Sequence, residues 1–247
     1  MYAKLFKSWT DAELANIGLA RTDDGIKIDI PQDANIYHMT VGAQIKAGRS
    51  AAPAMIFEHG DGTIERSSFG DIDAQATALA ADLRARGYGR GDLIGVHTGM
   101  RPETAIAHMA VCKLGATAVT LSQLYGPDAL AHALNHCEAR CLLSSETAWA
   151  PLRDAAAKKF PFLTDVLVCE TLGSEPDLQA ILRAGAPADF APDYTGADDA
   201  ALLMYTSGST GMPKGILHGH RVLASYRPSI SLFFNLSMHD EDAVFWS

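Results

Sequence analysis

The sequence predicts an α/β protein in which a mostly parallel β-sheet carries helices on both faces. Two observations support this fold class. First, the chain has 247 residues, 48% of them hydrophobic, which is enough to bury a core as one large or two small domains. Second, short apolar runs alternate with amphipathic segments of about 10 to 15 residues, which is the pattern of βαβ units.

Residues 1–50 mix polar and small side chains and contain one short helical stretch near 11–20. They predict an irregular N-terminal arm that packs on the main body. The apolar run at 54–57 is expected to be a strand, and the Asp61-Gly62 step after it is a hairpin signal. We therefore expect an antiparallel pair of strands there.

The main body begins with a helix whose start and end are both marked in the sequence. Ser68 and Asp71 have the spacing of a capping box, and apolar residues recur on one helical face until Gly87. Pro102 predicts the start of a second helix, because proline is favoured in the first turn. The other expected elements are strands at 93–96, 116–121, 140–144, 165–169 and 200–205, and helices at 127–137 and 147–158.

An acidic stretch with three prolines divides the chain. The stretch covers residues 170–199, and Arg183 is its one basic residue. We expect this stretch to be a linker with one short helix near 177–184. The predicted organisation is then an arm at 1–50, a first α/β subdomain at 51–170, the linker at 171–199, and the start of a second α/β subdomain at 200–247.

The charge balance excludes some classes of partner. There are 20 Lys and Arg against 29 Asp and Glu, a formal net charge of −9, so we expect no nucleic-acid partner, and any bound anion needs a local site. No apolar run approaches the roughly 20 residues of a membrane span, and the N-terminus lacks a secretory signal. The four cysteines have no framework spacing. These features predict a soluble, cytoplasmic protein; its oligomeric state is left open.

The segment that carries chemistry is YTSGSTGMPKG, residues 205–215. A strand feeds a loop with glycines that let backbone N–H groups turn toward an anion, with hydroxyl side chains as further donors, and with Lys214 as a point charge. It is no Walker A motif, because Gly215 rather than Ser or Thr follows the lysine. A flexible Ser/Gly linker would not require a lysine after proline or apolar strands on either side. The loop therefore predicts a polyphosphate site.

This string resembles the phosphate-binding signature of the adenylate-forming enzymes, which include acyl-CoA synthetases, luciferases and the adenylation domains of peptide synthetases. Residues 113–116 (KLGA) and 121–130 (LSQLYGPDAL) are also similar to this family, closest to its acetyl-CoA and medium-chain or aromatic acyl-CoA ligases. The resemblance runs from about Ile36 to the end of the chain.

The resemblance implies an ATP-dependent acid–thiol ligase. A carboxylate would attack the α-phosphate of Mg·ATP to give an acyl-adenylate and pyrophosphate, and the thiol of coenzyme A would then displace AMP. Lys214 would neutralise charge on the leaving pyrophosphate. The residues that would wrap the β- and γ-phosphates are Thr206, Ser207, Gly208, Ser209, Thr210 and Gly211. Acetate, a medium-chain fatty acid and an aromatic acid all remain open as the acid.

Three histidines are further candidates. His220 would, by the resemblance, line the acyl pocket beside the reacting carboxylate; the alternative is a solvated histidine at a helix start. His132 and His136 have the i, i+4 spacing of metal ligands on a helix, but no Glu follows His132. A structural or surface role is therefore favoured for this pair.

Members of the family continue well beyond the point that corresponds to Ser247. Their adenine-, ribose- and Mg²⁺-binding residues, their hinge and their catalytic lysine would all follow it. We therefore expect the chain to be a fragment of a ligase that is inactive alone. The alternative is a stand-alone, non-catalytic nucleotide-binding or interaction module.

Overall fold

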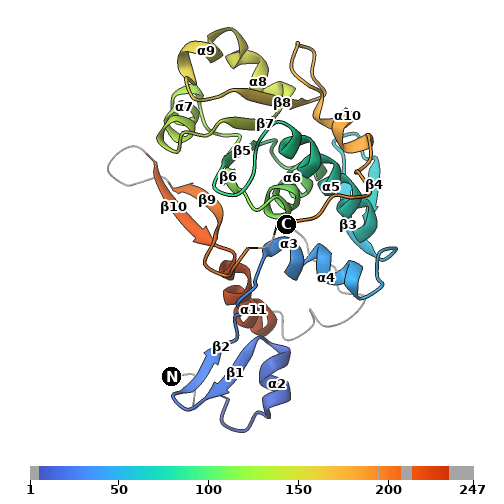
Figure 1. Cartoon of the computed structure of the whole chain (residues 1–247), viewed down its shortest axis with the longest axis vertical. Coiled ribbons are helices and arrows are strands. Elements are labelled where there is room, and N and C mark those ends of the chain that lie inside the picture. Colours follow the sequence, from blue (N-terminus) through green and yellow to red (C-terminus); the bar gives the residue numbers. More distant parts are fainter. Residues whose placement is uncertain (1–5, 194, 207–212, 234–247) are drawn as a thin grey trace.

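The computed structural model describes residues 6–193, 195–206 and 213–233. A six-stranded sheet in the order β10-β9-β6-β5-β7-β8 forms its centre (Figure 1). Five of the six strands run parallel, while β10 is antiparallel to β9 at one edge. The bounds are β5 Leu93–His97, β6 Thr117–Thr120, β7 Cys141–Ser145, β8 Asp165–Cys169, β9 Ala200–Thr206 and β10 Lys214–Gly219. The predicted fold class is confirmed.

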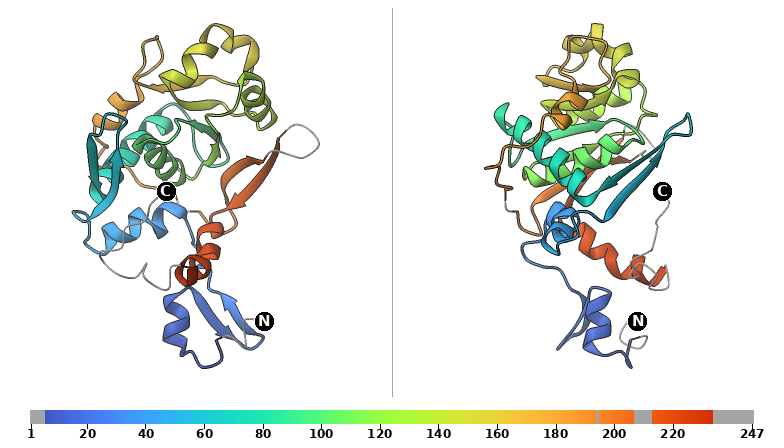
Figure 2. Two further views of the ribbon diagram at one scale, coloured as in Figure 1. Left: turned by 180° about the vertical axis from the view of Figure 1, so that it is seen from behind. Right: turned by 90° about the vertical axis from the view of Figure 1, so that its right-hand side faces the viewer.

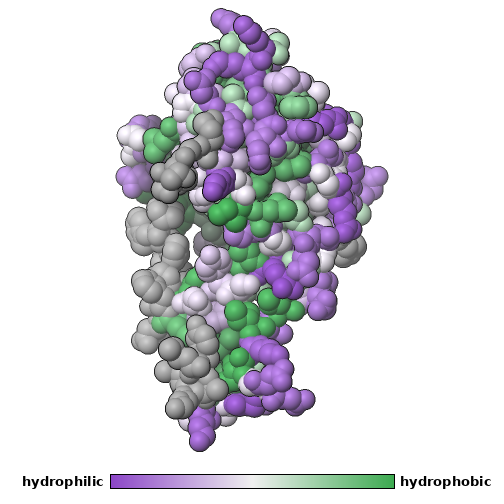
Figure 3. Space-filling view, turned by 90° about the vertical axis from the view of Figure 1, so that its left-hand side faces the viewer, coloured by the Kyte–Doolittle hydropathy of each residue, from purple (hydrophilic) through white to green (hydrophobic). Residues whose placement is uncertain are grey.

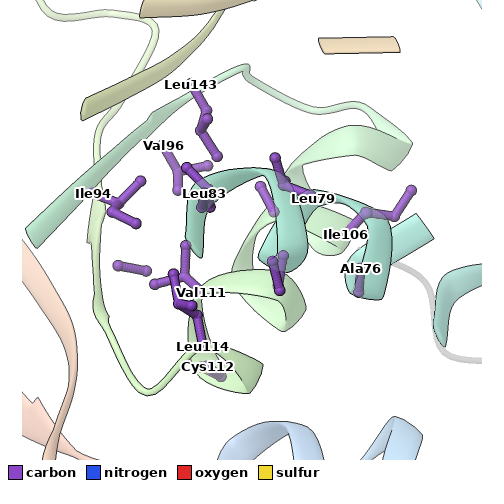
Figure 4. Packing of buried hydrophobic residues seen from close by; sticks show 14 of the residues in the cluster. Ala76, Leu79, Leu83, Ile94, Val96, Ile106, Val111, Cys112, Leu114 and Leu143 are labelled. Carbon is purple, nitrogen blue, oxygen red and sulfur yellow. The ribbon is translucent and has the colours of Figure 1, made fainter. Parts of the chain in front are cut away.

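Helices cover both faces of the sheet because successive strand residues point to opposite sides. Leu143 packs in one core with α5 (Phe69–Ala85), α6 (Pro102–Lys113) and α10 (Leu178–Arg183). Figure 4 shows the part of this core that Leu143 forms with α5 and α6. Its neighbour Leu142 packs in a second core with α7 (Pro127–His136) and α8 (Glu146–Trp149). The inner strands are thus apolar on both sides, which explains why they appear in the sequence as uninterrupted apolar runs.

Local signals set most helix ends as expected. Ser68 and Asp71 form the predicted capping box of α5, and proline stands in the first turn of both α6 and α7. The helix expected at 147–158 is wrong in one respect. The chain forms α8, a 3₁₀ turn at Ala150–Ala155 and α9 (Ala156–Lys159), because Pro151 has no N–H to continue the α-helical ladder.

The N-terminal region is more regular than predicted. Helix α2 (Asp11–Asn16) is followed by an antiparallel pair, β1 (Leu19–Thr22) and β2 (Gly25–Ile28), and then by α3 (Ile36–Met39) and α4 (Val41–Lys46). The expected helical stretch at 11–20 stops at Asn16, because Gly18 at φ 77° turns the chain. Figure 1 shows α2, β1 and β2 as a small unit next to α11 (Arg221–Phe233).

The antiparallel pair expected near residue 60 is present. Strands β3 (Pro53–Glu58) and β4 (Ile64–Ser68) form a hairpin beside α5 and outside the central sheet (Figure 2). The linker expected at 171–199 contains α10, close to the predicted short helix. Strand β9 then enters the same sheet beside β6, so the central sheet runs across the expected boundary between 199 and 200.

Candidate phosphate-binding site

Two of the predicted phosphate-binding residues lie on the described strands of the β9–β10 hairpin. Thr206 ends β9, Lys214 begins β10, and these two residues are partners in the strand register. The side chain of Lys214 is exposed and makes no ion pair with any residue in the described ranges. The other predicted phosphate ligands, Ser207, Gly208, Ser209, Thr210 and Gly211, lie outside the described residues.

The position of the hairpin in the sheet is one where α/β proteins commonly bind ligands. Strand β9 is parallel to β6, so Thr206 lies at the edge where the carboxyl ends of the parallel strands meet. Ligands of open α/β sheets bind outside this edge, where backbone N–H groups of the following loops are free. Thr206 and Lys214 therefore lie at an edge of the sheet that a polyphosphate can reach from solvent.

Tyr205 fixes the base of the hairpin. Its ring is buried, and its hydroxyl donates to the carbonyl of Ala133 in α7 at 3.0 Å. The hydroxyl of Tyr125, in the loop after β6, donates to the carbonyl of Tyr205 at 2.9 Å. Gly215 lies opposite Tyr205, where a Cβ would approach Leu203 Cδ1 at 3.1 Å. A side chain at position 215 would require Leu203 to shift by a few tenths of an ångström.

His220 is fully buried, which rules out the alternative of a solvated histidine at a helix start. Its Nδ1 accepts a hydrogen bond from the backbone N–H of Ile36 at 3.1 Å, which joins the start of α3 to the chain just before α11. Burial lowers the pKa of His220 to about 4, so the ring is neutral at pH 7. Because Nδ1 accepts, Nε2 carries the proton, and no hydrogen-bond partner faces it among the described atoms.

His132 and His136 contact the hairpin. Nε2 of His132 lies 3.0 Å from the carbonyl oxygen of Pro213, and Nδ1 of His136 lies 2.9 Å from the hydroxyl of Tyr205. In the described parts of the chain, no three His, Cys, Asp or Glu side chains converge in a way that could hold a metal ion. Sequence reasoning missed these contacts because the partners stand 81 and 69 residues away in the chain.

A cavity of about 290 Å³ lies elsewhere, between the β3–β4 hairpin and the start of α6. Arg101 at its wall pairs with Glu103 at 3.1 Å and with Glu170 at 3.2 Å. Neither Thr206 nor Lys214 lines this cavity. The arginine in it is already neutralised by carboxylates, so the cavity is a poor site for a polyphosphate.

Comparison with known proteins gives the family of the chain. The family model described as AMP-binding enzyme matches residues 43–247. The chain belongs to the AMP-binding enzyme family. The matched range includes every strand of the central sheet as well as Thr206, Lys214 and His220.

The chain is similar to curated acetyl-coenzyme A synthetases. The acetyl-coenzyme A synthetase of Parvibaculum lavamentivorans is 30% identical over 217 residues, which are 80% of this chain and 33% of that protein. Acetyl-coenzyme A synthetase 2 of Pseudomonas putida is 27% identical over 97% of this chain and 39% of its own length. The chain thus spans about a third of the length of these curated relatives.

Two solved structures share the fold over most of this chain. Anthranilate CoA ligase AuaEII, in complex with anthranoyl-AMP, has a TM-score of 0.68 and 25% identity over 78% of this chain and 35% of its own. Acetoacetyl-CoA synthetase from Streptomyces lividans has a TM-score of 0.71 at 19% identity, over 87% of this chain and 35% of its own. None of the helices in the described ranges is long and apolar enough to span a membrane.

Proposed function

We propose that the intact protein is an ATP-dependent acid–thiol ligase of the acyl-CoA synthetase type. A carboxylate oxygen attacks the α-phosphorus of ATP, the bond to the β-phosphate oxygen breaks, and acyl-AMP and pyrophosphate form. The thiol of coenzyme A then attacks the acyl carbon and releases AMP. The observation that carries the proposal is the register pairing of Thr206 with Lys214 at the carboxyl edge of the sheet in an AMP-binding enzyme sequence.

The chain's own residues contribute binding and charge stabilisation. In this proposal Thr206 and the loop residues 207–211 donate hydrogen bonds to the β- and γ-phosphates, and Lys214 offsets the charge that grows on the leaving pyrophosphate. Mg²⁺ enters as the counter-ion of ATP. The described residues include no group of three metal-ligating side chains, so we assign it no ligand among them.

The acid substrate is proposed only as a small-molecule carboxylic acid. The named relatives include acetyl-CoA and acetoacetyl-CoA synthetases and an anthranilate CoA ligase, which share a carboxylic acid and CoA but differ in the acyl group. We keep His220 as a proposed acyl-site residue. Its Nε2–H group, buried without a described partner, is a donor that could bind a carboxylate oxygen.

The decisive experiment is ATP–pyrophosphate exchange by the intact protein. With a panel of acetate, medium-chain fatty acids and aromatic acids, at least one acid should stimulate incorporation of labelled pyrophosphate into ATP. Binding of Mg·ATP without exchange for any acid would instead support a non-catalytic nucleotide-binding module. Neither binding nor exchange would contradict both functions.

Two narrower proposals concern the chain itself. We propose that residues 1–247 alone do not form acyl-AMP, which is supported by their span of about a third of the relatives' length. Detectable acyl-AMP from the purified 247-residue chain would contradict this. We also propose a reducing, cytoplasmic location, supported by four cysteines that are all free.

A further inference from the structure

Two histidines of α7 face the base of the β9–β10 hairpin. Residues four apart lie on one face of a helix, and the rings of His132 and His136 are 5.7 Å apart with a tilt of 30°. Both rings meet Tyr205 edge-on, at centroid distances of 6.3 and 5.8 Å. The pair therefore packs against the strand that leads into the phosphate loop.

His132 holds the second strand of the hairpin. Its Nε2 lies 3.0 Å from the carbonyl oxygen of Pro213. A carbonyl can only accept, so this nitrogen carries the hydrogen and donates it. Pro213 has no N–H, and its carbonyl is therefore its one backbone group available for a hydrogen bond. Lys214 is the next residue, so this bond fixes the peptide unit that enters the lysine.

His136 holds the first strand. The Tyr205 hydroxyl donates its single hydrogen to the Ala133 carbonyl, so Nδ1 of His136 must supply the hydrogen in its 2.9 Å contact with the same hydroxyl. Thr206 is the next residue after Tyr205. One turn of α7 thus contacts the residues that immediately precede Thr206 and Lys214, the two described phosphate-binding candidates.

We propose that His132 and His136 are positioning residues that hold Thr206 and Lys214 in place for the phosphates of ATP. The inference rests on the proposed function and adds two residues to it. Among the described strands, β10 pairs only with β9, so contacts outside this ladder are its direct links to the rest of the protein. Residues 214–217 of β10 are exposed and have little side-chain packing. The hydrogen bond from His132 to Pro213 therefore links the start of β10 directly to helix α7.

The test compares variants of the intact protein in ATP–pyrophosphate exchange. His132→Ala and His136→Ala should each raise the KM for ATP about five-fold, the factor expected for one lost hydrogen bond. The KM for the acid should stay unchanged. His132→Gln retains an N–H donor and should restore most of the affinity for ATP.

A control on the same helix separates positioning from general damage to α7. Asn135 stands between the two histidines, but its side chain donates to the carbonyl of Lys159 at 2.9 Å, away from the hairpin. Asn135→Ala should leave the KM for ATP unchanged. An equal rise of that KM in Asn135→Ala, or no rise in either histidine variant, would overturn the proposal.

A second measurement keeps this inference separable from the ligase assignment. Amide hydrogen exchange of the intact protein should become faster in peptides covering β10 in His132→Ala, and stay unchanged in peptides covering β5 and β7. If the wild-type protein shows no pyrophosphate exchange, the proposed function fails, and calorimetric affinity for Mg·ATP decides the inference. Equal affinity and equal amide exchange in wild type and His132→Ala would overturn it.

Discussion

Strands β5 and β10 belong to one sheet but are held in different ways. Strand β5 lies between β6 and β7, and its residues 94–97 are all buried. Among the strands that the structure describes, β10 has β9 as its one neighbour, and residues 214–217 of β10 are exposed. Figure 3 shows hydrophobic groups at the surface of the side that carries this edge of the sheet. The centre is fixed by burial on both faces, while the edge strand is held by its ladder to β9 and by polar contacts such as that of His132 with Pro213.

This difference explains where the candidate chemistry lies. A lysine that must meet a polyphosphate has to stay near solvent, because burial penalises its charged form. The exposed position of Lys214 on the edge strand β10, outside the buried centre of the sheet, agrees with this requirement. The contrast leads to four predictions, from the largest effect to the smallest.

The largest effect is expected at the centre of the sheet. Ile94 is fully buried in the core between β5 and the helices α5 and α6. Ile94→Ala should lower the free energy of unfolding by about 2–5 kcal/mol, because it removes buried methyl groups and leaves a cavity. Urea denaturation measures this, with Ile94→Val as a control that should cost about 0.5–1.5 kcal/mol. Equal losses in both variants would show that burial does not hold β5.

The next effect concerns catalysis at the edge. Lys214→Ala in the intact protein should lower kcat/KM for ATP about 10²- to 10³-fold, because it removes a cation beside the phosphate charge that develops in the transition state. The unfolding free energy should change little, since the side chain is exposed. Exchange kinetics unchanged by the substitution would remove Lys214 from the mechanism.

A pH effect is expected where the edge joins the N-terminal region. The folded pKa of His220, about 4, lies below its usual value of 6.5, so folding favours the neutral ring. That stabilisation is complete above pH 6.5 and is lost as the pH falls toward 4, by up to about 3 kcal/mol. Denaturation curves between pH 4 and 7 measure it. In His220→Gln this part of the pH dependence should disappear; an unchanged profile would assign it to other groups.

The smallest effect is expected on the exposed face of β10. The side chain of Leu217 is 60% exposed, so Leu217→Ser in the 247-residue chain should change the free energy of unfolding by no more than about 0.5 kcal/mol. Thermal and urea denaturation compared with Ile94→Ala provide the measurement. A loss close to that of Ile94→Ala would show that β10 is as firmly packed as β5.

The sequence was informative where local signals and burial agree. The strand predicted at 165–169 coincides with β8, and the Ser68–Asp71 box opens α5 as expected. The prediction was wrong where two signals conflicted. The apolar periodicity of residues 147–158 indicates one helix, but Pro151 interrupts the α-helical hydrogen bonds and divides the segment. The N-terminal pair β1–β2 was missed because its strands are only four residues long and show no clear alternation.

The residue types of the candidate site could be predicted from the sequence, but the long-range contacts that hold these residues in place could not. Residue types alone marked Lys214 as a phosphate partner, and this assignment stays a prediction. The Nδ1 of His220 accepts a hydrogen bond from the N–H of Ile36, which stands 184 residues earlier in the chain. The hairpin contacts of His132 likewise join distant segments. No local pattern encodes such partners, because they arise only when the helices pack on the sheet.

The strand order also has a kinetic consequence. Ala118 of β6 pairs with Leu202 of β9, so the strand that ends at Thr206 must close a long loop before it gains its ladder. Strands β5 to β8 are complete by residue 169 and can assemble first, both during synthesis and on refolding. The candidate ATP edge is therefore expected to form last, and a pulse-labelling experiment should find the amides of β9 and β10 protected after those of β5 and β7.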